Sequence, residues 1–126
     1  MFKSFAQTLA IVLFTSLLAL SPASLSTALA AGAIAVDDEE GENPTDVGYG
    51  IGYGSSREEA ATAAMAECRK SGNKGCKVAV RFDTCGAYAA SKAHYGVGWG
   101  ASKAVATAAA LESCGAGCKL VVADCE

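Results

Sequence analysis

The sequence is poor in the side chains that carry most catalysis and metal binding. Its 126 residues include one histidine, His94, one tryptophan, Trp99, and two prolines. A zinc site built from cysteine and histidine is therefore disfavoured, and any mechanism that needs an imidazole must use His94. We predict no catalytic residue, no bound metal and no cofactor.

The N-terminal apolar run is too short to cross a membrane. It occupies residues 9–20, twelve in all, whereas a membrane-spanning helix needs about 20. Lys3 precedes it, and a small–x–small motif at residues 28–30 follows, which is the order found in a signal peptide and its cleavage site. We expect residues 1–30 to be removed. The remaining domain, residues 31–126, is then secreted or periplasmic and does not insert into a membrane.

Positive charge is scarce. Ten Lys and Arg face thirteen Asp and Glu, and the loss of Lys3 with the signal peptide changes the formal net charge from −3 to −4. An acidic domain of this kind does not suit nucleic acid. All six cysteines lie within residues 68–125, and an even number in a short exported chain is typical of a disulfide framework.

The mature sequence repeats itself with an offset of 46 residues. Residues 49–68 align with residues 95–114 without a gap, and nine of these twenty positions are identical. Each copy has a strand in which glycine alternates with large residues, then a serine that can cap a helix, an alanine-rich helix and a cysteine. We predict two copies, at about residues 32–85 and 86–125.

Each copy is predicted to fold as strand, strand, helix, strand. The first strands are expected at residues 33–36 and 87–90, and the third strands at 77–82 and 119–123. The glycine face of the second strand lets the helix approach closely, and Ser56 with Glu59 forms a capping box. The expected fold is α+β, in which the two repeats form a mixed or antiparallel sheet covered by two alanine-rich helices.

Six cysteines allow 15 pairings, and the repeat favours a symmetric one. The simplest scheme pairs Cys68 with Cys76, Cys114 with Cys118, and Cys85 with Cys125. The first two bridges fix a helix end to the next strand, and the third links the two copies.

The combined motif resembles the bacterial secreted family of domain of unknown function 4189. The motif joins paired glycine–aromatic strands to the helix starts Ser56-Arg57 and Ser102-Lys103, and then to Gly-Cys-Lys-hydrophobic strands. The resemblance covers essentially all of the mature chain. It implies a small exported protein without an established enzymatic activity and assigns no functional residue. The acidic insertion at residues 37–46 departs from the expected pattern, and we predict a solvated, flexible loop there.

Aromatic side chains of the glycine strands are the leading binding candidates. They are Tyr49, Tyr53, Tyr95 and Trp99, with His94 beside the second pair. Exposed, they can stack on sugar rings or on a protein partner. The alternative, favoured by the small number of large aliphatic residues, is that they form core. The uncharged helix segment 104–111 indicates either deeper burial or a partner contact.

These features favour a non-enzymatic exported binding module. It would be an inhibitor or secreted effector that acts on an unknown protein or an envelope glycan. Two alternatives stay open: a structural envelope protein, and a small envelope hydrolase that uses Asp83, Asp124 or His94.

Overall fold

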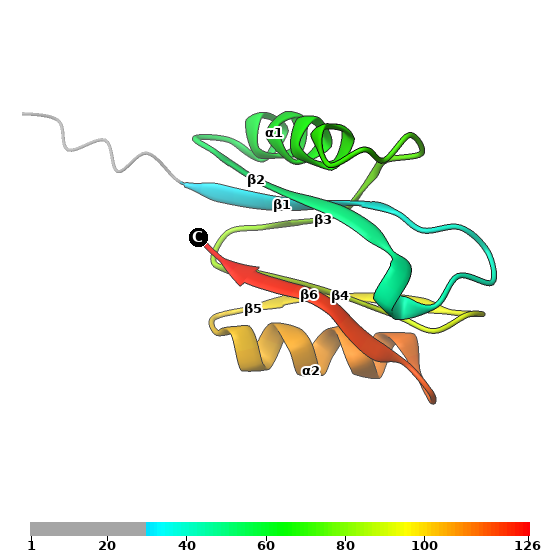
Figure 1. Cartoon of the computed structure of the whole chain (residues 1–126). Helices are drawn as coiled ribbons and strands as arrows, with labels where there is room; N and C mark the ends of the chain where they lie inside the picture. Colours follow the sequence, from blue (N-terminus) through cyan, green and yellow to red (C-terminus); the bar gives the residue numbers. More distant parts are fainter. Residues whose placement is uncertain (1–29) are drawn as a thin grey trace, which may run out of the picture.

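The computed structural model describes residues 30–126, so the predicted signal peptide lies outside the described residues except for Ala30. Two strand–strand–helix–strand units follow one another along the chain (Figure 1). The first has β1 (Ala31–Asp37), β2 (Gly48–Gly54), α1 (Arg57–Lys70) and β3 (Lys77–Phe82), with a short 3-10 helix, η1 (Pro44–Asp46), before β2. The second has β4 (Cys85–Ala90), β5 (Tyr95–Gly100), α2 (Lys103–Cys114) and β6 (Lys119–Cys125). The predicted α+β fold is confirmed.

Each unit forms its own three-stranded antiparallel sheet. The strand orders are β2-β1-β3 and β5-β4-β6, so the first strand of each unit is central. The helix of each unit joins the two strands that flank this central strand. We expected one sheet. Two form instead, because every strand ladder within residues 30–126 joins strands of the same unit.

The two sheets pack face to face, and one helix covers the outer face of each (Figure 1). The four layers therefore enclose three interior layers of side chains. The layer between the sheets holds the large side chains, among them Ile34, Val36, Phe82 and Tyr88. The two layers under the helices consist mainly of alanine and cysteine. Burial of small side chains brings the helices close to the sheets.

The glycines of β2 and β5 face the helices, as the sequence pattern predicts. A Cβ atom at Gly50 would overlap the backbone nitrogen of Cys68, and one at Gly52 would overlap that of Ala64. A side chain at either position would therefore push α1 off the sheet.

Serine caps begin both helices. The Ser56 hydroxyl accepts a hydrogen bond from the Glu59 backbone N–H at 3.1 Å, and Ser102 accepts one from Val105 at the same distance. The second half of the predicted capping box is wrong. The Glu59 carboxylate accepts a hydrogen bond from the Ser55 hydroxyl at 2.6 Å instead of one from the Ser56 backbone N–H. Ser55 competes successfully because its backbone N–H also donates to this carboxylate, at 3.4 Å.

Three disulfides staple the units. Cys68–Cys76 and Cys114–Cys118 each join a helix end to the start of the next strand. Cys85–Cys125 is the third, but Cys85 is the first residue of β4 and pairs in register with Cys125 of β6. The third bridge therefore lies within the second unit. The expectation that it links the two copies is wrong because the boundary between them lies before Cys85.

The acidic insertion is anchored at its start, and most of residues 39–46 are exposed to solvent, as predicted. Asp37 accepts hydrogen bonds from the backbone N–H groups of Lys74 and Gly75 at 3.2 and 3.1 Å. Asp38 accepts one from the hydroxyl of the buried Tyr88 in β4. The first unit is thereby fastened to the second through a carboxylate.

Candidate binding cleft

The four aromatic side chains of the glycine strands are exposed. Tyr95 and Trp99 keep 64% and 63% of their accessible surface, and Tyr49 and Tyr53 keep 41% and 44%. The expectation that they form core is therefore wrong. The interior takes Tyr88 of β4 instead, which is 1% exposed.

These aromatic residues lie on opposite edges of the sandwich. Both β2 and β5 are edge strands, in different sheets. β5 packs over β3, whereas Tyr53 of β2 reaches Asp124 of β6 in the other sheet. The structure therefore separates Tyr49 and Tyr53 from Tyr95 and Trp99 and forms no single aromatic surface from all four.

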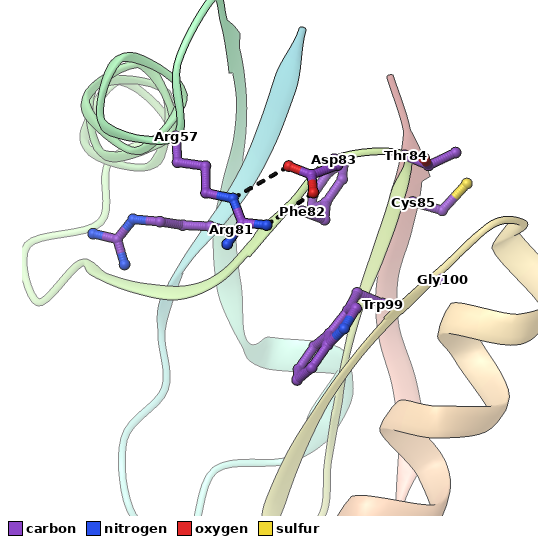
Figure 2. A pocket seen from close by; sticks show the side chains of 8 residues that line it. All are labelled: Arg57, Arg81, Phe82, Asp83, Thr84, Cys85, Trp99 and Gly100. Atoms are coloured by element: carbon purple, nitrogen blue, oxygen red, sulfur yellow. Dashed lines mark hydrogen bonds and ion pairs between the residues drawn. The ribbon is translucent and has the colours of Figure 1, made fainter. Parts of the chain in front are cut away.

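Trp99 borders a cleft of about 380 Å³ at the end of the molecule where β3 and β5 finish and α1 begins (Figure 2). The cleft is lined by Arg57, Arg81, Phe82, Asp83, Thr84, Cys85, Trp99 and Gly100. Its volume lies at the lower end of the range of small-ligand sites, about 300–1,000 Å³. The volume of the cleft therefore suits a ligand of one or two rings.

A two-point ion pair forms the polar wall of the cleft. Arg57 Nε donates to Asp83 Oδ1 at 3.2 Å, and Nη2 donates to Oδ2 at 2.9 Å. The hydrogen bonds from Arg57 hold the pKa of Asp83 below its usual range. Because both side chains are mostly exposed, the pair adds little to stability. It does leave a guanidinium N–H and carboxylate lone pairs directed to solvent in a fixed geometry.

Figure 2 shows how the walls face one another. The indole of Trp99 lies on the β5 side of the cleft, and the ion pair of Arg57 and Asp83 lies on the side of α1 and β3. The Arg81 side chain extends away from Trp99, on the side of α1. The cleft thus combines one flat apolar surface, the indole of Trp99, with one polar group, the ion pair of Arg57 and Asp83, which we call the fork.

The floor of the cleft is rigid. Phe82 is 1% exposed, and its ring is wedged against Gly32 of β1 and Gly86 of β4, the two central strands. Cys85, at the margin, is held by its disulfide to Cys125. Because these contacts involve both sheets, the cleft forms only when the two units are packed together.

The equivalent position in the first unit is engaged differently. Tyr53 corresponds to Trp99, since they pair in register with Gly32 and Gly86. The Tyr53 hydroxyl donates to Asp124 Oδ2 at 2.6 Å, and burial together with this bond raises the pKa of Tyr53 to about 12. Within residues 30–126, Tyr53 therefore has an internal hydrogen-bond partner and the Trp99 indole has none.

The remaining predicted residues lie apart from this cleft. His94 and Tyr95 border a second hollow at the other end of β5, where Tyr95 stacks on Tyr88 with ring centroids 6.0 Å apart. Tyr49 borders a third hollow beside Leu120. Burial raises the pKa of the Tyr88 hydroxyl, which donates to Asp38.

The side chains proposed for hydrolysis are not brought together. Asp83 lines the Trp99 cleft, Asp124 bonds to Tyr53, and His94 borders the second hollow. The uncharged helix segment is not deeply buried either, since Val105 is 53% exposed.

The sequence marks Trp99 as a binding candidate but does not indicate the partners that complete its cleft. From the sequence, Arg57 is the start of a helix and Asp83 a candidate acid for hydrolysis. The available signal was the divergence of the copies: Trp99 replaces Tyr53, and Arg57 stands where the second copy has Lys103.

No group of three or more His, Cys, Asp or Glu suited to hold a metal ion occurs within residues 30–126. Neither helix of this part of the chain is long and apolar enough to cross a membrane. The three disulfides fit a protein of the periplasm or the extracellular space.

Comparison with known proteins gives one result. Residues 31–125 match the model of a family described as Domain of unknown function (DUF4189). No curated protein and no solved structure matches the chain.

Proposed function

This chain belongs to the DUF4189 family, which carries no assigned activity, and from the geometry of its cleft we propose that it is an exported, non-enzymatic module that binds an envelope glycan. The observation that carries the proposal is Trp99. This large side chain is 63% exposed and borders a cleft whose opposite wall is the ion pair of Arg57 and Asp83.

A sugar ring suits both walls. Its C–H face is apolar and stacks on an indole, which offers a large flat surface at small conformational cost. Its hydroxyls are paired donors and acceptors, and the fork supplies both: Arg57 donates and Asp83 accepts. The prior ion pair keeps the two groups in place, so little ordering is needed on binding.

The same cleft is poorly equipped for hydrolysis. Glycosidases use two carboxyl groups on either side of the scissile bond. Asp83 is the one carboxylate among the residues that line the cleft, and its hydrogen bonds to Arg57 favour the ionised form. Binding without chemistry is therefore the function that these residues support.

Trp99 is also the probe that tests the proposal. Because it is the one tryptophan of the chain, its fluorescence reports the cleft alone. We expect neutral and acidic envelope-type oligosaccharides, added to the processed protein, to shift and quench this emission with saturable binding. Retention of the protein on insoluble polysaccharide should be lost in Trp99→Ala and reduced in Asp83→Asn.

Tyr53→Ala is the matched control, because Tyr53 holds the equivalent position in the first unit. It should leave glycan retention unchanged. If no glycan perturbs the Trp99 emission, or if Trp99→Ala is retained as well as wild type, the proposal is wrong. A cleft that binds a protein partner instead of a glycan would give the first of these results.

A further inference from the structure

We propose that the glycan is acidic: one sugar stacks on Trp99, and the carboxylate of a neighbouring sugar is bound by Arg81. This inference rests on the glycan-binding function proposed above and adds the class of glycan. It begins from the position of Arg81, which borders two hollows at once.

A fourth hollow lies beside α1 and shares Arg81 with the Trp99 cleft. It has a volume of about 420 Å³, and its lining includes Met65, Arg69 and Val78 besides Arg81. In Figure 2 the Arg81 side chain leaves the Trp99 cleft and extends to the side of α1. A group bound by this guanidinium therefore belongs not to the sugar stacked on Trp99 but to one farther along the glycan.

Charge in the two hollows opposes that of the protein. Arg57, Arg69 and Arg81 line them, against the two carboxylates of Glu58 and Asp83. This surface is thus cationic by one unit, although the protein as a whole has more acidic than basic residues. A local excess of positive charge on an acidic protein attracts an anionic ligand.

Arg81 is the cation free to bind that anion. Within residues 30–126 the one ion pair is that of Arg57 with Asp83, so Arg57 is already neutralised, whereas Arg69 and Arg81 are not. Of these two, Arg81 alone also lines the Trp99 cleft. A guanidinium binds a carboxylate through two parallel hydrogen bonds. The fork beside Trp99 then recognises hydroxyls, and Arg81 recognises the acid.

A structural role is the alternative for Arg81. A charged residue on an edge strand such as β3 prevents the edges of two molecules from pairing. That role predicts that Arg81→Gln promotes self-association and leaves the affinity for every glycan unchanged. The two roles are therefore separable by measurement.

The test compares tetragalacturonate with the same oligosaccharide fully methyl-esterified, each titrated against Trp99 fluorescence of the processed protein. The two probes share rings and linkages and differ in charge. We expect wild type to bind the acid about tenfold more tightly, the effect of one charge-assisted contact. Arg81→Gln should abolish this difference and keep the affinity for the ester. Arg81→Lys should keep part of the difference.

Lys77→Gln is the control, because Lys77 lies on the same strand, loses the same charge and borders a different hollow. It should keep the tenfold preference. Equal binding of acid and ester by wild type would overturn the acidic class, as would an equal loss of both in Arg81→Gln. Binding of a neutral glycan would then still support the proposed function. If no glycan of any kind perturbs Trp99, both proposals fail.

Discussion

Tyr53 and Trp99 occupy equivalent positions in the two units, yet the Tyr53 hydroxyl is bonded to Asp124 at 2.6 Å while the Trp99 ring borders an open cleft. The hydrogen bond joins β2 of one sheet to β6 of the other. Tyr53 therefore helps to hold the two sheets together, whereas Trp99 is available to a ligand.

This difference predicts unequal effects on stability. Tyr53→Phe removes a hydrogen bond to a carboxylate and should lower the free energy of unfolding by about 1 kcal/mol. Trp99→Ala removes an exposed ring and should change it by less than about 0.5 kcal/mol. Urea unfolding with the disulfides intact measures both. A larger loss in Trp99→Ala would mean that the ring is a structural element of the cleft wall.

The close approach of α1 to β2 predicts a severe effect of a single methyl group. In Gly52→Ala the new Cβ would overlap the backbone of Ala64, which cannot move without lifting the helix. We expect a loss of about 3 kcal/mol or more, beyond the range of ordinary overpacking. Gly98→Ala should behave alike, since its Cβ would overlap Ala106 of α2. An unchanged urea midpoint in either variant would contradict the packing described.

Stability at low pH should depend on Asp124. The hydrogen bond from Tyr53 holds the pKa of Asp124 below its ordinary value of 3.8. A carboxyl group with a lowered folded-state pKa stabilises the fold above its ordinary pKa, and this contribution is lost as the pH falls through the lowered value. Wild type should therefore lose its advantage over Asp124→Asn as the pH is reduced below about 4.

Thermal unfolding of the two proteins between pH 6 and pH 2 follows this effect. Glu40→Gln is the control, because within residues 30–126 the loop carboxylates that accept hydrogen bonds include Asp38 and Glu42 but not Glu40. It should run parallel to wild type. A constant difference between wild type and Asp124→Asn at every pH would show that the bond does not depend on ionisation.

The repeat made most of the fold predictable. Glycine alternation located β2 and β5 and the faces that contact the helices, because the absence of a side chain is itself the packing signal. The division into two sheets was not predictable, because the residues of a central strand do not indicate which strands pair with it. The same limit applies to Cys85: it follows β3 in sequence, but only the pairing with Cys125 shows that it opens β4.

The candidate site was predictable in its first residue alone. Trp99 stands out where the copies differ, but Arg57 and Asp83 are separated by 26 residues, and their bond depends on how α1 meets the end of β3. The alternating pattern predicts that the aromatic face of each glycine strand is buried. The pattern does not show that β2 and β5 are edge strands, where the opposite sheet leaves part of that face exposed.

The three disulfides should contribute unequally. Their sequence separations are 40 for Cys85–Cys125, 8 for Cys68–Cys76 and 4 for Cys114–Cys118. A bridge restricts the unfolded chain more when it closes a longer loop, so its removal should cost about 4, 2.5 and 2 kcal/mol, in that order. Variants in which both cysteines of one bridge are replaced by alanine avoid free thiols, and urea unfolding gives each cost. The reverse order would mean that native packing at the helix ends, and not restriction of the unfolded chain, sets the value of each bridge.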